Sequence, residues 1–197
     1  MAEAVAALRR RGVIGFPTET FYGLGADALD EEAVERVFAL KGRDPNNPLP
    51  VIIADEEMLQ SIVVAISPLA RRLMERFWPG PLTLVLPGHA RLPKPLVNRN
   101  GGVGVRISSH PLAQRLVKEL GRPITATSAN PSGQPPARSR AEVVGYFGSR
   151  VGIVIDGGKL TAEKGSTVVE VFAQGIRVIR EGEIAAETLA QAARLDS

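Results

Sequence analysis

The stretch Phe38–Ile53, FALKGRDPNNPLPVII, joins the end of an amphipathic helix to the start of a buried strand. The helix is indicated by the residues that precede it, because Asp30 can cap a segment whose apolar side chains recur at helical spacing as far as Lys41. The strand is indicated by the apolar run that follows Pro50. A helix and a strand are therefore expected to alternate here across a stiff, polar turn.

The same alternation continues on both sides of this turn. Helices are expected at residues 2–10, 30–41, 56–65, 68–77, 110–121, 141–147 and 186–194. Strands are expected at residues 13–18, 50–54, 82–87, 103–107, 123–126, 151–156, 166–172 and 176–182. The last two strands are separated by only three residues, AQG, so they should be antiparallel. No composition break marks a second domain, and the pattern predicts a single α/β domain, residues 1–197, with a twisted, mixed parallel and antiparallel sheet flanked by helices.

Length and hydropathy favour a soluble, cytoplasmic protein. A chain of 197 residues with 44% hydrophobic content can bury one substantial core. No apolar run approaches the roughly 20 residues that span a bilayer. The N-terminal MAEAVAALRRRG carries its cations after its apolar residues, the reverse of a secretory signal. We therefore expect no membrane association.

The residue census narrows the possible chemistry. The chain has no cysteine, which excludes disulfides, thiolate nucleophiles and Cys-ligated metals. Its only histidines are His89 and His110, so a Ser-His-Asp triad has almost nothing to be built from, and no metal-ligating set is predicted. The formal net charge of +3 suits an anionic small ligand or RNA without requiring either.

The polar turn at residues 41–50, called the opening turn below, carries two cations that have two interpretations. Lys41 and Arg43 follow a helix, and cations favour helix C-termini through the macrodipole. That interpretation does not account for Asn46 and Asn47, which stand among three prolines. A preorganised polar turn of this kind favours binding of a polyanion, since little entropy is lost on ordering it.

The segment PTETFYGLG, residues 17–25, lacks the GK[ST] ending of a phosphate-binding loop. One interpretation is a turn that needs positive φ at Gly23 or Gly25. The other places the hydroxyl groups of Thr18 and Thr20 at the mouth of the sheet, where α/β folds hold ligands. Sequence reasoning leaves both open.

Three further segments carry candidate ligand-binding residues. Arg106 stands inside the apolar VGVRI, where it needs either a buried ion pair or a bound carboxylate or phosphate. The hydroxyl-rich TATSAN, residues 125–130, follows a strand end and suits either a turn or a ligand site. Arg180 ends a strand that looks exposed, and by itself it indicates solvated surface.

Six motifs taken together resemble the YrdC-like family, the L-threonylcarbamoyladenylate synthases: FPTETFYGLG, KGRDPNNPL, PGPLTLVL, VGVRISSHP, TSANPSG and GSTVVEV with IRVIREG. The resemblance covers Val5 to Glu183 and implies a twisted α/β fold with a concave, positively charged cavity. It also implies formation of threonylcarbamoyl-AMP and pyrophosphate from L-threonine, bicarbonate or CO2, and ATP, for the threonylcarbamoyladenosine modification of tRNA. Longer relatives carry a second domain, so this chain is expected to be the short, single-domain form.

The resemblance also assigns site residues. It makes Lys41 and Arg43 catalytic. The positions implied for ATP are Lys41, Arg43, Asn47, Gly102, Ser128, Asn130, Pro136 and Arg180. The positions implied for threonine are Thr20, Ile52, Arg106, Ala126 and Ser166. The family often has histidine where Ile52 stands and threonine where Gly102 stands. Mg²⁺ is expected to accompany ATP.

The implied partners are ATP, L-threonine, bicarbonate, tRNA or double-stranded RNA, and the downstream proteins that transfer the threonylcarbamoyl group to tRNA. Two alternatives stay open. The first is a carbamoyl-adenylating domain that is not specific for threonine, as in hydrogenase-maturation carbamoyltransferases. The second is a double-stranded RNA or tRNA-binding module that uses the arginines of RLPKPLVNRN and ARSR. Threonine-dependent turnover separates the main interpretation from both.

Overall fold

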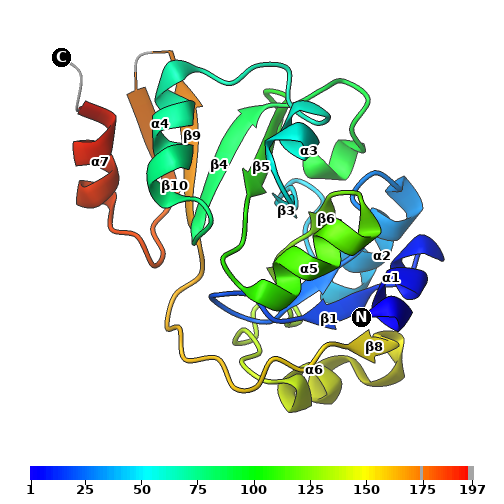
Figure 1. The fold of residues 1–197 in the computed structure, drawn as a ribbon. Coiled ribbons are helices and arrows are strands. Elements are labelled where there is room, and N and C mark those ends of the chain that lie inside the picture. The colour runs from blue at the N-terminus through cyan, green and yellow to red at the C-terminus, as the bar shows by residue number, and fades with distance from the viewer. Residues whose placement is uncertain (174, 195–197) are drawn as a thin grey trace.

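The computed structural model describes residues 1–173 and 175–194, in which helices and strands alternate along the chain (Figure 1). The α-helices are α1 (Ala2–Arg9), α2 (Glu31–Lys41), α3 (Glu56–Gln60), α4 (Pro68–Phe77), α5 (Pro111–Leu120), α6 (Arg140–Phe147) and α7 (Ala186–Arg194), and the 3-10 helices are η1 (Lys94–Leu96) and η2 (Gly148–Arg150). The strands are β1 (Ile14–Phe16), β2 (Gly23–Gly25), β3 (Val51–Ile52), β4 (Leu82–Pro87), β5 (Gly102–Arg106), β6 (Ile124–Thr125), β7 (Thr127–Ser128), β8 (Ile153–Val154), β9 (Thr167–Phe172) and β10 (Gly175–Arg180).

The strands form two sheets, where the sequence predicts one. One has the order β7-β2-β1-β8 and the other the order β10-β9-β4-β5-β3-β6. Both are mixed: β1 is antiparallel to β2 and parallel to β8, while β4 is antiparallel to β5 and parallel to β9. The predicted α/β class and the antiparallel pairing of β9 with β10 are confirmed.

Strand β2 is an inner strand of the four-stranded sheet, in a segment that the sequence predicts as a loop. A Cβ at Gly23 would lie 3.1 Å from the ring of Phe16, and one at Gly25 would lie 2.9 Å from it. Neither glycine has positive φ. The turn interpretation of these glycines is therefore wrong, and they are instead the residues that let β2 lie close against β1.

The helix that precedes the opening turn forms as predicted. The carboxylate of Asp30 accepts a hydrogen bond from the amide of Ala33 at 3.2 Å, which caps α2. The helix ends at Gly42, whose φ of 58° is left-handed and suits glycine. Lys41 is thus the last helical residue, and Arg43 begins the turn.

The predicted helix at residues 56–65 is wrong beyond Gln60. The hydroxyl of Ser61 donates to the carbonyl of Met58 at 2.7 Å, which closes α3 after a short run. The amide of Val64 then donates to the carbonyl of Pro87 at 2.8 Å. This β-branched segment pairs with the end of β4, and that pairing replaces helical hydrogen bonding.

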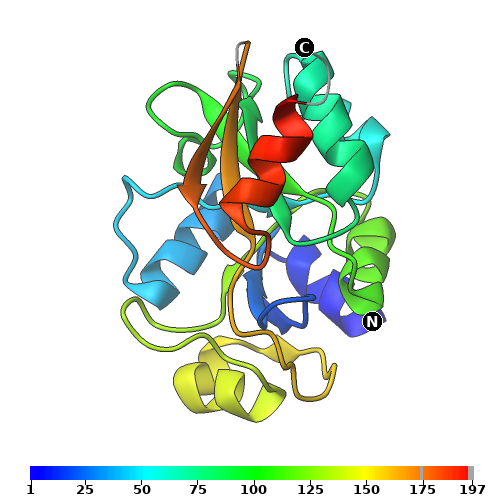
Figure 2. The same cartoon turned by 90° about the vertical axis from the view of Figure 1, so that its left-hand side faces the viewer.

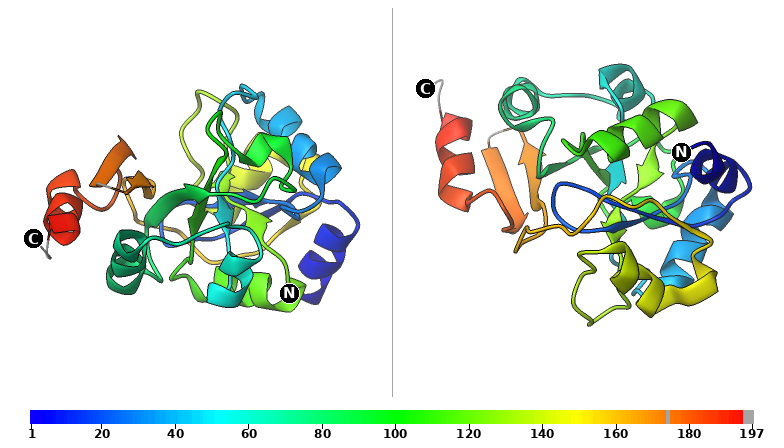
Figure 3. Two further views of the ribbon diagram at one scale, coloured as in Figure 1. Left: turned by 90° about the horizontal axis from the view of Figure 1, so that it is seen from above. Right: turned by 60° about the horizontal axis from the view of Figure 1, so that its bottom comes forward.

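Helices cover the sheets on their outer faces. Helix α7 packs against α4 and β10, and α1 packs against α5 (Figures 1 and 2). Strands β9 and β10 with α7 lie together at one side of the molecule, away from α1 and α2 (Figure 3). Among the described residues, no helix combines the length and apolar character that a membrane span needs.

Candidate active site

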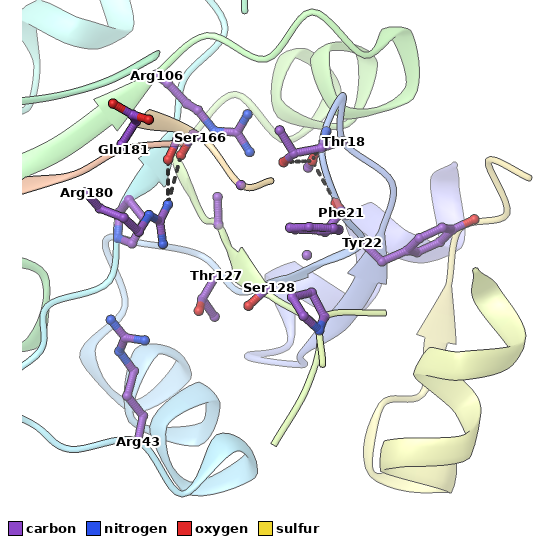
Figure 4. A pocket seen from close by; sticks show the side chains of 16 residues that line it. Thr18, Phe21, Tyr22, Arg43, Arg106, Thr127, Ser128, Ser166, Arg180 and Glu181 are labelled. Carbon is purple, nitrogen blue, oxygen red and sulfur yellow. Dashed lines mark hydrogen bonds between the residues drawn. The ribbon is translucent and has the colours of Figure 1, made fainter. Parts of the chain in front are cut away.

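A cavity of about 270 Å³ lies between the two sheets (Figure 4). From the side of the four-stranded sheet it is lined by Thr18, Thr20, Phe21, Tyr22, Gly23, Thr127 and Ser128. From the side of the six-stranded sheet and its connections it is lined by Arg106, Ala126, Gly165, Ser166, Arg180 and Glu181, and Arg43, Pro50 and Pro136 complete the wall. Hydroxyl groups and arginines from distant parts of the chain therefore face one space.

A second cavity, of about 400 Å³, adjoins the first. Arg43, Pro50 and Arg180 line both cavities. Asn47 and Gly102 line the second cavity, beside the apolar side chains of β4, β9 and β10. The two spaces form an elongated site with the arginines of the opening turn and of β10 at the junction.

Most of the predicted residues meet at this site. The first cavity holds Thr20, Arg43, Arg106, Ala126, Ser128, Pro136, Ser166 and Arg180, and the second adds Asn47 and Gly102. Three predicted residues, all within the described part of the chain, line neither cavity: Lys41, Ile52 and Asn130. Their assigned roles in binding or catalysis stay predictions.

Lys41 is buried, with 4% of its surface exposed. Its ammonium donates to the carbonyl oxygens of Ser128 at 2.5 Å and Asn130 at 2.8 Å, and to the side-chain oxygen of Asn130 at 3.4 Å. Burial, together with the nearby charge of Arg43, lowers the pKa of Lys41 to about 8. All three of its N–H groups have an acceptor, so Lys41 holds the loop that follows β7.

Asn130 and Ile52, the other two residues outside the cavities, also have structural contacts. The side-chain amide of Asn130 donates to the carbonyls of Pro131 at 2.9 Å and Gln134 at 2.8 Å, which shapes the turn after β7. Ile52 is fully buried in β3 and packs in an apolar cluster with residues of β1 and α5. The position where the family often has histidine is therefore part of the core in this chain.

Arg43 extends from the opening turn into the junction of the cavities. Its guanidinium donates to the carbonyls of Asn47 at 2.8 Å and Pro48 at 3.4 Å, and burial lowers its pKa. The neighbouring carboxylate of Asp44 accepts from the backbone and side-chain amides of Asn46, both at 2.9 Å. The Asp44 side chain therefore bonds within the turn instead of pairing with Arg43, and these hydrogen bonds lower the pKa of Asp44.

Of the two interpretations of Arg106, the structure shows the buried ion pair. It is buried at the end of β5 and forms an ion pair with Glu19, in which the two side chains are 6% and 12% exposed. The same carboxylate accepts a hydrogen bond from Ser108. Arg106 also lines the first cavity, so the ion pair leaves it available to a ligand.

Arg180 is anchored through Ser166. Its guanidinium donates to the carbonyl of Ser166 at 2.8 Å and to the hydroxyl at 3.3 Å (Figure 4). The Ser166 hydroxyl also lies 2.9 Å from the hydroxyl of Thr83. Desolvation of the guanidinium against the cavity wall, followed by the charges of Arg106 and Arg43, lowers the pKa of Arg180. Arg180 is exposed, as the sequence predicts, and its guanidinium also forms part of the cavity wall.

The surroundings of Gly102 explain why glycine stands where the family often has threonine. A Cβ at this position would lie 2.8 Å from Val85 and 3.0 Å from the side chain of Asn98. The side-chain oxygen of Asn98 accepts the amide of Gly102 at 2.8 Å. Asn98 thus fills the space that a threonine side chain at position 102 would need.

Sequence reasoning missed two residues that shape this site. Glu19 stands between Thr18 and Thr20, behind the cavity wall, and its ion-pair partner Arg106 is 87 residues away in the chain. Tyr22 is fully buried, and its hydroxyl donates to the carbonyl of Gly158 and accepts the amide of Gly157, both at 2.9 Å. The sequence signal for this segment is the pair Gly157 and Gly158: a Cβ at Gly157 would lie 2.5 Å from Pro17, and Gly158 has a φ of 76°.

The residues at the site give no cage for a resident metal. Within residues 1–173 and 175–194, no group of three or more His, Cys, Asp or Glu side chains is placed to hold a metal ion. The cavity wall offers one carboxylate, Glu181. The Glu181 carboxylate is directed to Ala186 and Lys164, so a Mg²⁺ ion at this site would be held through substrate phosphates and water.

The fold and the site together define an α/β domain whose cavity can hold a polyanion beside a small polar molecule. A sequence model of the Sua5/YciO/YrdC family, described as "Telomere recombination", matches residues 6–182. The chain belongs to this family.

Known proteins support the same relationship. The chain is 40% identical over 186 residues to a threonylcarbamoyl-AMP synthase of Pyrococcus abyssi, covering 94% of this chain and 55% of that protein. It is 42% identical over 166 residues to a threonylcarbamoyl-AMP synthase of Thiobacillus denitrificans, covering 84% of this chain and 88% of that protein. The crystal structure of P. abyssi Sua5 complexed with L-threonine superposes with a TM-score of 0.91 at 40% identity, over 96% of this chain and 56% of that one. The chain thus spans about half the length of its P. abyssi relative.

Proposed function

We propose that the chain is an L-threonylcarbamoyladenylate synthase, which forms threonylcarbamoyl-AMP and pyrophosphate from L-threonine, bicarbonate or CO2, and ATP. The observation that carries this proposal is the meeting of Arg43, Arg106 and Arg180 around one cavity that hydroxyl groups also line. The names of the relatives, and the threonine complex of one of them, support the same activity.

The proposed reaction needs no nucleophile from the protein. The threonine amine adds to CO2 and loses a proton, which gives a carbamate. A carbamate oxygen then forms a bond to the α-phosphorus of ATP, while the bond from that phosphorus to the bridging oxygen breaks and pyrophosphate leaves. The protein has to position the two reactants and stabilise the charge that develops on the phosphates.

Arg43 and Arg180 are the residues proposed to contact the phosphates, since they line both cavities. A guanidinium keeps its charge and offers paired donors to phosphate oxygens. Arg106 is proposed to bind the threonine carboxylate, with the hydroxyls of Thr20 and Ser166 nearby on the same wall. Mg²⁺ would arrive with ATP and would neutralise phosphate charge.

The test measures pyrophosphate release from Mg-ATP and bicarbonate, with and without L-threonine, and identifies the adenylate by its mass. Release that depends on threonine supports the proposal. Release without threonine would instead indicate a carbamoyl-adenylating domain, and no release together with salt-sensitive RNA binding would indicate an RNA-binding module. Delivery of the product to tRNA-modifying proteins in the cytoplasm completes the proposed role.

A further inference from the structure

Glu19 stands between two threonines that line the first cavity, but does not itself line it. One carboxylate oxygen accepts from the guanidinium of Arg106, and the other accepts from the hydroxyl of Ser108. Ser108 is fully buried, and its hydroxyl also accepts the amide of His110 at 3.2 Å. The Glu19 carboxylate is therefore held in place behind the cavity wall, against the one arginine proposed to bind the amino acid.

The other two arginines of the cavity are held differently. Arg43 donates to the carbonyl oxygens of the opening turn, and Arg180 donates to the carbonyl and hydroxyl of Ser166. Among the ion pairs of the described residues, neither arginine contacts a carboxylate. Neither arginine is therefore held in an ion pair within these residues, and the Asp44 carboxylate beside Arg43 accepts hydrogen bonds from Asn46 instead.

The carboxylate of Glu181, which lines the same cavity, is directed elsewhere. It accepts the amide of Ala186 at 3.0 Å and lies 3.9 Å from the ammonium of Lys164. Glu19 is thus the acidic side chain that is paired with a cavity arginine in the described part of the chain.

This arrangement gives the cavity two electrostatically different ends. At the end formed by Arg43 and Arg180, charge attracts a polyphosphate. At the end formed by Arg106, the net charge of the buried pair is close to zero, while guanidinium N–H groups remain to donate hydrogen bonds to one carboxylate. Without Glu19, Arg106 would be a third arginine without an ion-pair partner and would attract phosphate as well.

We propose that Glu19 is a positioning and specificity residue: by neutralising and orienting Arg106, it keeps phosphate groups out of the amino-acid end of the cavity and directs Arg106 towards a substrate carboxylate. This inference rests on the proposed function, because that function places an amino acid and a triphosphate in the same site. Glu19 acts through Arg106 and takes no part in bond formation.

The test is equilibrium binding of L-threonine and of inorganic phosphate, each measured alone by titration calorimetry without turnover. Glu19→Gln keeps the shape of the side chain and an oxygen acceptor for Arg106 but removes the charge. We expect threonine to bind about tenfold more weakly and phosphate about tenfold more tightly, the scale of one altered charge contact. Ser108→Ala releases the carboxylate without removing its charge, so threonine affinity should fall with no gain for phosphate.

The control is Glu56→Gln, which removes an equal charge from the exposed ion pair with Arg71 and should change neither affinity. A Glu19→Gln protein that binds both ligands as the wild type does, or that loses affinity for both alike, would overturn the inference. If the wild type binds no threonine, the proposed function fails, while the phosphate titration still decides whether Glu19 controls anion entry. If Glu19→Gln does not fold, unchanged threonine affinity in Ser108→Ala overturns the inference.

Discussion

The ammonium of Lys41 donates a 2.5 Å hydrogen bond to the carbonyl oxygen of Ser128, and this bond fixes the end of helix α2 to strand β7 beside the cavity. The backbone adds a second connection, because the carbonyl of Lys41 accepts the amide of Ser132, in the loop after β7, at 2.8 Å. Lys41 is predicted from the resemblance to act on ATP. Its contacts give it a role in positioning Ser128, which does line the cavity.

Replacing Lys41 should therefore destabilise the protein. Lys41→Met keeps an unbranched side chain but leaves the carbonyl oxygens of Ser128 and Asn130 without their donor, at a cost of about 1–2 kcal/mol in the free energy of unfolding. Urea denaturation measures it, and Lys118→Met, on the exposed face of α5, is the control. Full stability of Lys41→Met, together with lost turnover, would show instead that the ammonium acts on the substrate.

The same lysine should give stability a particular dependence on pH. Its pKa is about 8 in the folded chain, against an ordinary value of 10.5. Between these values the unfolded chain holds a proton that the folded chain has released, so raising the pH favours the folded state. Relative to Lys41→Met, the wild type should gain about 1 kcal/mol per pH unit in this window. Denaturation at pH 8 and pH 9.5 tests it, and a difference that shrinks as the pH rises would contradict it.

Arg43→Ala should impair turnover more than stability. The guanidinium stands at the junction of the two cavities, where it is proposed to stabilise phosphate charge. Loss of such a preorganised contact costs about 3 kcal/mol, or on the order of a hundredfold in kcat/KM. Pyrophosphate release measures the effect, with Arg115→Ala, from an exposed pair on α5, as the control. Near-full turnover of Arg43→Ala would remove this residue from the mechanism.

Gly182 should tolerate no side chain. A Cβ there would lie 2.0 Å from the carbonyl oxygen of Gly165, which adjoins Ser166 in the cavity wall. Gly182→Ala has to displace this backbone, and we expect a loss of about 1–3 kcal/mol in stability together with weaker threonine binding. Gly145→Ala is the matched control, since it meets nothing within 4 Å in helix α6 and should stabilise by about 0.5–1 kcal/mol. Equal melting temperatures for the two variants would refute the steric argument.

The parts of the fold that follow from local sequence could be predicted. Helix α2 carries its cap, its apolar spacing and its terminal glycine within one segment, so its bounds follow from neighbours in the chain. Strand β2 could not be predicted in this way, because GLG has weak strand preference by itself. It forms because its glycines fit against Phe16, a contact that exists only in the folded structure.

For the site, too, contacts between distant parts of the chain could not be predicted from the sequence. The motifs predict that Arg43, Arg106 and Arg180 share one site, and all three line one cavity. The sequence left open whether Arg106 has an acidic partner. Glu19 could not be chosen among the acidic residues, because its pairing depends on how the segment after β1 lies against β5. Likewise, the burial of Lys41 depends on the loop after β7, which lies far along the chain.

The division into two sheets has a mechanical consequence for whatever the cavity binds. Thr20 precedes β2 of one sheet, whereas Arg106 ends β5 of the other. A molecule that contacts both works as a non-covalent cross-link between them, so its binding free energy adds to their cohesion. Opening of either sheet should then become rarer in the occupied protein, and release of a tightly held product should be slowed by the need to separate the sheets at that point.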